Sequence, residues 1–577
     1  MHKLRGNPWA TLAVLSLGFF MTLLDLTIVT IAIPDMVGGL DASLDQILWI
    51  GNAYTLALAV LMITSGRLGD LIGKRDLFLY GVALFTVASL ACGLAGDPAQ
   101  LIAFRAVQGV GAAMLLPQTL SLVVDVFPPG RRGAALGIWG VVAGVSGAAG
   151  PTVGGLLVTR LEWRWIFFVN VPIGVLTVIG AALWLPRPVR AVRHRFDLTG
   201  VALSSVALVL LSLGLIEGER YHWNGWIRAA LGASAVVAVV FLAQQRRRQD
   251  AEPLVPFALF KERNFTLMNV VAVAIAFGIV GLSLPLTIYL QSVLGYSAQK
   301  AGLVLLSLSL GTFVTAGPAA VLAERLSGRW ILTGGLSLFA GGLGWIVAVA
   351  DVGGGWTSIA VPLFVMGVGA GCTFAPMAAE VMRNVPPRLT GAASGVNNAL
   401  RQVGSVLAGA VVGAVLQERL VVSLREQAER RSAGLPPAYR SSFVRGFEGA
   451  ARHLDVAGGG STAPRPPAGM PAAQAHRLQD TAAAVFGHGF VDAMRPTMLV
   501  AVVVTGLGAL SCLLVRRFEG ASANPHGLPM TEAEIAAAEE AEEAKAATAE
   551  EAATADETAA ATARPGAVGP AAVDGRT

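Results

Sequence analysis

Apolar residues occur in this chain as long runs separated by short polar stretches. Each run is about 20 residues long, which is enough to cross the hydrocarbon core of a bilayer as a helix. In hydrocarbon every backbone amide must be paired within its own segment or in a closed barrel, and runs of this length do not fit barrel strands. The pattern therefore predicts an all-α polytopic membrane protein with about fourteen transmembrane helices, at residues 12–33, 47–65, 77–94, 99–124, 134–158, 165–184, 198–216, 227–243, 265–290, 301–322, 331–350, 359–381, 395–415 and 498–515.

Composition supports this interpretation. The 577 residues are 54% hydrophobic and only 14% charged, which is more apolar surface than one soluble core can hide. The net charge of +5 is spread over short clusters between apolar runs, which argues against a nucleic-acid partner. Cys92, Cys372 and Cys512 lie singly inside apolar runs, so neither a disulfide framework nor a metal site is expected.

Loop charges predict the orientation. The loop after every even-numbered span is basic, whereas the odd-numbered short loops carry acids and few bases. By the positive-inside rule both termini are expected in the cytoplasm. Residues 1–9 are short and basic, and the apolar run that follows shows no cleavage site, so we expect a first membrane helix rather than a signal peptide. Abundant Ala, Gly and Arg with little Lys favour a bacterial cell (inner) membrane.

Two segments fall outside the apolar pattern. Residues 420–492 contain a Gly/Pro-rich patch and are expected to form a long extracytoplasmic loop with some helix at its ends. Residues 519–577 are rich in Ala and Glu, and we expect a disordered cytoplasmic tail.

A polar motif follows the second span. It consists of glycines that favour a turn and a carboxylate placed to pair with basic groups or a helix end. Its residues are Gly66, Leu68, Asp70, Gly73, Lys74 and Arg75. The basic residues also fit simple positive-inside topology, which is the alternative interpretation.

Charged residues inside apolar helices are the main functional candidates. Arg105, followed by Gln108, Gly109 and Gly111, costs on the order of 3 kcal/mol in a membrane unless it faces a cavity or a partner. In the alternative interpretation, the long side chain of Arg105 extends to the outer surface of the membrane. Asp25 can hold a proton when it is buried and release it when a cavity fills with water. The alternative for Asp25 is a structural hydrogen bond near Thr27 or Thr30.

Three further stretches have distinctive patterns. Small residues that let helices approach closely recur in the fifth span, with a proline that permits bending, at Gly140, Gly144, Gly150, Pro151, Gly154 and Gly155. The sixth span opens with the aromatic segment 163–174, which also suits an interfacial belt. The thirteenth opens with a Gly, Ser and Asn pattern that includes Asn398, Arg401 and Gln402, candidates for substrate contact or for helix anchoring.

Together these motifs resemble the major facilitator superfamily, in its drug/proton antiporter branch with fourteen helices. The resemblance implies two six-helix bundles (1–186 and 265–518) with two inserted helices at 187–264. It also implies proton coupling at Asp25 and Arg105, a cytoplasmic gate at the Asp70 motif and an exporter signature in the fifth span. One departure is Leu71, where the family often has a basic residue, so a latch here must use Lys74, Arg75 or Arg131.

The expected function is proton-driven export of small hydrophobic or cationic compounds across the plasma membrane. Because Asp25 is the only clearly deep carboxylate, few protons per cycle and neutral or monocationic substrates are expected. Alternatives are a narrow-specificity exporter of a metabolite or natural product, and a non-transporting membrane sensor. Sequence signatures of ATP-binding loops and of common hydrolases are absent, so neither an enzyme nor a cofactor is expected.

Overall fold

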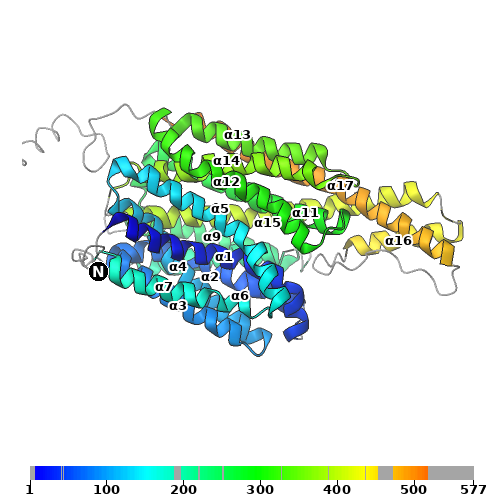
Figure 1. Ribbon diagram of the computed structural model, residues 1–577, viewed down its shortest axis with the longest axis horizontal. Helices are drawn as coiled ribbons and strands as arrows, with labels where there is room; N and C mark the ends of the chain where they lie inside the picture. Colours follow the sequence, from blue (N-terminus) through cyan, green and yellow to red (C-terminus); the bar gives the residue numbers. More distant parts are fainter. Residues whose placement is uncertain are drawn as a thin grey trace, which may run out of the picture. The chain divides into compact units, whose positions relative to one another are not determined.

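A computed structural model describes residues 7–516, apart from 41, 43, 187–196, 219–220, 222, 250–252, 327, 387–388, 434, 436 and 453–471. Within these residues, 14 helices are long and apolar enough to cross a membrane, which confirms the predicted number. Figure 1 shows them running side by side along the long axis of the bundle. The expected tail at 519–577 lies outside the described residues.

The first six spans contain seven helices because the sixth span is broken near its start. The helices are α1 (Pro8–Leu40), α2 (Leu44–Ile72), α3 (Lys74–Leu94), α4 (Pro98–Val126), α5 (Pro129–Arg160), α6 (Trp165–Phe168) and α7 (Asn170–Trp184). Helix α4 starts where Asp97 accepts a hydrogen bond from the amide of Gln100 at 2.9 Å, and Pro98 needs no partner at the first position. Helices α2 and α3 pack on α4, which makes α4 the centre of this half.

The last six spans form the second half. Its helices are α11 (Arg263–Ile288), which ends in a short π-helical turn (Tyr289–Val293), α12 (Ala298–Leu326), α13 (Gly328–Val349), α14 (Trp356–Met382), α15 (Thr390–Ser432) and α17 (Ala472–Cys512). The halves meet where α12 and α14 pack on α5, and where α15 packs on α2 and α4. A Cβ added to Gly140 would lie only 3.2 Å from that of Ala375, so small residues allow this close packing.

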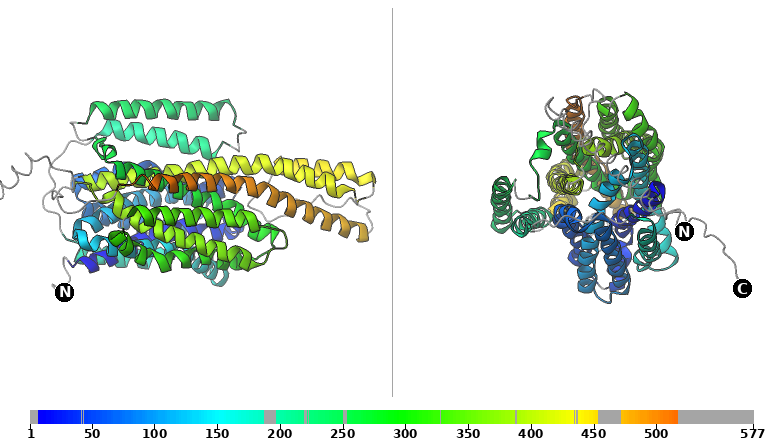
Figure 2. Two further views of the ribbon diagram at one scale, coloured as in Figure 1. Left: turned by 90° about the horizontal axis from the view of Figure 1, so that it is seen from above. Right: turned by 90° about the vertical axis from the view of Figure 1, so that its left-hand side faces the viewer.

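An inserted pair, α8 (Leu198–Ile216) and α9 (Gly225–Arg247), lies beside the bundle, as the left view of Figure 2 shows, and α8 contacts both α2 and α15. A short helix, α10 (Ala258–Lys261), follows the pair. Asp197 caps α8 and accepts hydrogen bonds from Gln244 and Gln245 of α9 at 3.0 and 2.7 Å. Burial raises the pKa of Asp197, but these hydrogen bonds, the Gly200 amide and the Arg248 guanidinium together bring it below its ordinary value. This cluster ties the two helices together at one end.

Residues 420–492 differ from the expected loop. Helix α15 continues to Ser432, α16 spans Pro437–Arg452 and α17 begins at Ala472, so the described part is largely helical (Figure 1, right). The extension continues the apolar core of the bundle, and buried side chains contribute to it from all three helices: Leu420, Leu424, Ala428, Phe443, Phe447, Leu478, Ala482 and Val485. Burial on one side of each helix favours continued helix over open loop.

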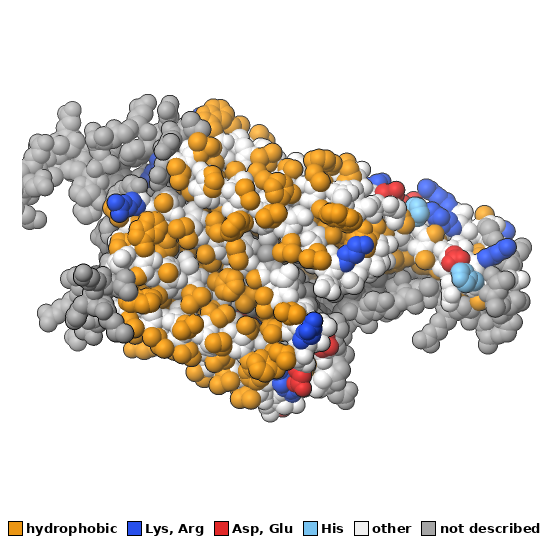
Figure 3. Space-filling model, viewed as in Figure 1, with side chains coloured by type: hydrophobic (Ala, Val, Ile, Leu, Met, Phe, Trp, Pro, Cys, Tyr) orange, Lys and Arg blue, Asp and Glu red, His pale blue; other side chains and the backbone are white. Residues whose placement is uncertain are grey.

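Large apolar side chains are exposed around the helical bundle. In Figure 3 they cover most of the face shown, whereas charged side chains gather towards the end that carries α16. Leu94, Leu176 and Val239, for example, are more than half exposed. A surface of this kind is stable when lipid rather than water surrounds it.

Candidate functional site

A buried ion pair joins α1 to α4 in the first half. Arg105 forms a hydrogen-bonded ion pair with Oδ2 of Asp25, and the two side chains are 2% and 0% exposed. The Nε of Arg105 also donates to the carbonyl oxygen of Ile50 in α2 at 3.1 Å. Arg105 therefore does not reach the outer surface; its charge is met inside the protein, where leaving it unpaired would cost several kcal/mol.

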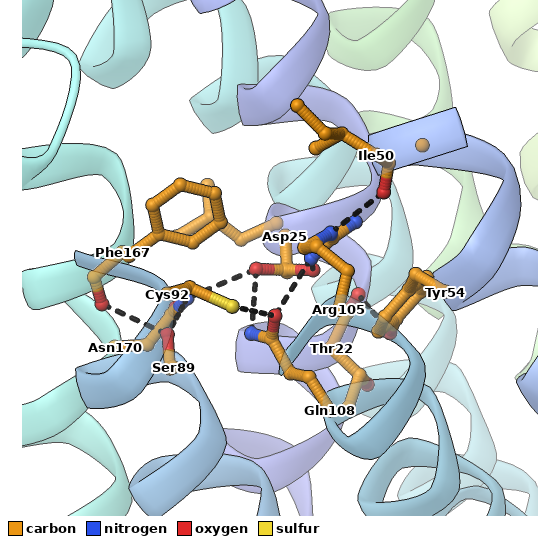
Figure 4. Close-up of polar contacts among 12 residues, drawn as sticks. Thr22, Asp25, Ile50, Tyr54, Ser89, Cys92, Arg105, Gln108, Phe167 and Asn170 are labelled. Atoms are coloured by element: carbon orange, nitrogen blue, oxygen red, sulfur yellow. Dashed lines mark hydrogen bonds and ion pairs between the residues drawn. The ribbon is translucent and has the colours of Figure 1, made fainter. Parts of the chain in front are cut away.

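Two amides complete the surroundings of the Asp25 carboxylate (Figure 4). Gln108 Nε2 donates to Oδ1 of Asp25 at 2.9 Å, while its Oε1 accepts from Arg105 at 2.8 Å. Asn170, at the start of α7, donates to the same Oδ1 at 3.2 Å. The carboxylate therefore receives donors from both α4 and α7.

A second layer holds these groups in place. Ser89 of α3 accepts from Asn170 Nδ2 at 3.2 Å and donates to the carbonyl oxygen of Phe167 at 2.9 Å. The ring of Tyr54 lies 4.3 Å from the Arg105 guanidinium carbon, in a cation–π contact. Asn170 Oδ1 is buried and has no hydrogen-bond partner among the described residues, which leaves one acceptor beside Asp25. We call Asp25, Arg105, Gln108 and Asn170 the Asp25 network.

The glycine-rich stretch of α5 lies against the same part of α1. A Cβ on Gly150 would collide with Thr27, two residues from Asp25, so a glycine is required for this approach. Towards the other end of α5, a Cβ on Gly144 would fall 3.1 Å from Thr312 of α12. Gly154 is buried, while a Cβ on Gly155 would meet open space. The side chain of Pro151 lies outside the described residues.

The Asp70 motif joins the two halves at one end of the bundle, which we call the Asp70 end. The carboxylate of Asp70 accepts the backbone N–H groups of Gly391 and Ala392 at 3.0 and 2.9 Å. These are free donors in the first turn of α15, where the helix dipole also favours a negative charge. A Cβ on Gly66 would fall 2.5 Å from the carbonyl oxygen of Gly391, so the two helices touch through backbone.

Lys74 and Arg75 differ in what they contact. Lys74 Nζ lies 3.8 Å from Asp70, 2.6 Å from Asp125 of α4 and within hydrogen-bond distance of Thr390 of α15. Arg75 instead contacts Asp76 and the carbonyl oxygen of Ala182 within its own half. Lys74 therefore links the halves, whereas the contacts of Arg75 among the described residues stay within the first half.

Gly73 makes the turn of this motif possible. It lies between α2 and α3 with φ of 107°, a conformation that costs a residue with a side chain substantially more than glycine. The backbone conformation of this turn therefore requires glycine at position 73.

Asn398, Arg401 and Gln402 lie on α15, away from the Asp25 network. Arg401 Nη2 donates to Asn398 Oδ1 at 2.8 Å, and Asn398 Nδ2 donates to the carbonyl oxygen of Ser394 at 3.0 Å. Arg401 and Gln402 are partly buried.

The structure brings together Asp25, Arg105 and Gln108, which the sequence singled out separately. It adds Asn170 and Ser89, which the sequence analysis did not select. Asn170 falls in the aromatic stretch that was interpreted as an interfacial belt. The sequence feature that could have identified it is a single amide side chain after an apolar run. Ser89 carried no signal, because serine is common in membrane helices.

Comparison with known proteins places these features in a family. The model of the Major Facilitator Superfamily matches residues 15–409. The chain is 36% identical to the tetracenomycin C resistance and export protein of Streptomyces glaucescens, over 91% of this chain and 95% of that protein. It is 33% identical to the multidrug export protein EmrB of Escherichia coli, over 69% of this chain and 77% of that protein.

A solved structure shares the fold. The human organic anion transporter MFSD10 (TETRAN) superposes with a TM-score of 0.54 at 13% identity, covering 86% of this chain and 99% of that chain. Members of the matched family are transporters that carry small molecules across a lipid bilayer, rather than enzymes. With its fourteen apolar helices and its family match over most of the membrane portion, the chain belongs to the major facilitator superfamily.

Proposed function

We propose that this protein is a proton-driven antiporter that exports small hydrophobic compounds, drugs and antibiotics among them, across the plasma membrane. The observation that carries the proposal is the Asp25 network: a fully buried carboxylate paired with a buried arginine inside a transporter fold. A group of this kind changes its protonation state when its surroundings change, which is the property that proton coupling needs.

In the proposed cycle, Asp25 takes up a proton when water reaches it. Protonation removes its charge and weakens the pair with Arg105, and the free acceptor of Asn170 can then receive the new O–H after a side-chain rotation. Loss of the pair frees α1 to move relative to α4. Release of the proton restores the pair. Each protonation state therefore favours one arrangement of the helices.

The Asp70 end is proposed to be the cytoplasmic gate, closed in this structure. Asp70, Lys74 and the amides at the start of α15 hold the halves together there. Opening breaks these contacts and exposes the first turn of α15 to water. This assignment agrees with the loop charges, which put both termini and the Asp70 loop on the cytoplasmic side.

Efflux from cells tests the proposal. An efflux-deficient bacterial host that expresses the protein is expected to accumulate less of some lipophilic dyes and antibiotics than a host with an empty vector, and an uncoupler is expected to remove the difference. Reduced accumulation that persists with the uncoupler would show another energy source. Equal accumulation of every compound would contradict export of this class.

A narrow-specificity exporter of a natural product is the second candidate. This candidate is favoured by the match to the tetracenomycin C resistance and export protein, which covers 91% of this chain. Including tetracenomycin C in the same panel separates the two: export of this compound alone indicates the narrow function.

A further inference from the structure

Arg401 is a positive charge deep within the second half that no described carboxylate neutralises. At 1.5 Å per residue it lies about 16 Å along α15 from Thr390, near the middle of a ~30 Å hydrocarbon layer. The only partner of its guanidinium among the described residues is Asn398, a neutral amide on the same helix. By contrast, Arg105 is paired with Asp25. The cost of placing Arg401 there is therefore not offset by any carboxylate among the described residues.

The direction in which Arg401 projects follows from its neighbours on α15. Ser394, Asn398 and Arg401 are spaced at i, i+4 and i+7, so they share one face of the helix. Ser394 on that face donates to the carbonyl oxygen of Pro117 in α4 at 2.9 Å, which places the face towards the first half. Leu407 and Val411, 37% and 39% exposed, mark a different side that suits lipid. Arg401 therefore faces the seam between the two halves.

The guanidinium of Arg401 keeps donors available. Its five N–H groups make one described hydrogen bond to another side chain, and none of its nitrogens is among the fully buried atoms that lack a partner. The remaining donors are thus not fully buried.

We infer that Arg401 binds an acidic group, a carboxylate or an ionised phenol, of the hydrophobic compounds that the protein transports. This rests on the proposed export function and specifies its substrate class. Guanidinium groups bind carboxylates through paired, charge-assisted hydrogen bonds. The membrane potential, negative inside, also favours outward movement of an anion. The assignment departs from the neutral or monocationic preference that Asp25 alone suggests.

1-Naphthylacetate and 2-(1-naphthyl)ethylammonium test this directly, because they share the same ring and nearly the same size but have opposite charge, and only the first has a carboxylate. Their binding to full-length protein in a non-ionic detergent and a low-salt buffer without carboxylates is measured by isothermal titration calorimetry. We expect 1-naphthylacetate to bind, Arg401→Gln to weaken that binding about tenfold or more, and 2-(1-naphthyl)ethylammonium to be unaffected by the substitution. Arg401→Lys keeps the charge but loses the paired hydrogen bonds, and its affinity is expected to lie between those of wild type and Arg401→Gln.

The matched control is Arg419→Gln, the same change at an exposed arginine further along α15, which should bind as wild type does. Three results would overturn the inference: no binding of 1-naphthylacetate, equal binding by wild type and Arg401→Gln, or displacement by chloride as complete as the effect of the substitution, which would indicate a site for small inorganic anions. The assay needs no transport. If the protein binds the anion but exports nothing, the proposed export function is wrong while the anion site at Arg401 still stands.

Discussion

Replacing Asp25 with asparagine is expected to lower uncoupler-sensitive efflux to the level of an empty vector. The amide fills nearly the same space but cannot take up or release a proton, and it leaves Arg105 buried without an anion, a situation that costs about 3–5 kcal/mol elsewhere. Drug accumulation in an efflux-deficient host measures the effect, with protein level in the membrane determined alongside.

Asp35→Asn is the matched control, because Asp35 is an exposed carboxylate on the same helix and should be dispensable. Asp25→Glu keeps a titratable group and should retain part of the activity. Efflux by Asp25→Asn equal to that of wild type would show that Asp25 has a structural role and that another group carries the proton.

The second large effect is expected from Asp70→Asn. The amides of Gly391 and Ala392 donate to different oxygens of Asp70, so an asparagine in the same position would replace one acceptor by an NH₂ group that faces an N–H donor. Loss of a charged hydrogen bond destabilises the proposed closed gate by about 2–3 kcal/mol, which is roughly a thirty- to 150-fold change in population. Amide hydrogen exchange in the first turns of α15 should accelerate accordingly.

Asp76→Asn provides the comparison for that experiment. Asp76 lies six residues further along and its side chain is 43% exposed, in an ion pair with Arg75 that does not involve α15. Its replacement should leave exchange in α15 unchanged. If Asp70→Asn exchanges at the wild-type rate as well, Asp70 does not hold the gate closed.

The fold was accessible from the sequence because lipid imposes a simple rule. Each span must be apolar and must satisfy its own backbone, so fourteen spans could be located from composition alone. In residues 420–492 some helix was expected at the ends, but the extent of the helical extension was underestimated because its residues are polar on average. Its signal was the recurrence of Leu416, Leu420, Leu424 and Ala428 at every fourth position, all of which are buried.

The candidate site was only partly accessible. A charge in an apolar helix predicts that a partner exists, and this was enough to select Asp25 and Arg105. Which residues meet depends on how helices rotate and cross, and this is set by packing over the whole bundle. Asn170 was therefore missed, and Asp70 could not be assigned to the start of α15, because more than 300 residues separate the two along the chain.

Proton movement during transport tests the central claim most directly. Proteoliposomes are loaded with a compound identified in the efflux panel and with a pH-sensitive dye, then diluted into compound-free buffer. If the protein exchanges protons for substrate through Asp25, the lumen should acidify as the compound leaves, and Asp25→Asn should show no such acidification. Loss of the compound without any pH change in wild type, or equal acidification in both proteins, would contradict the account.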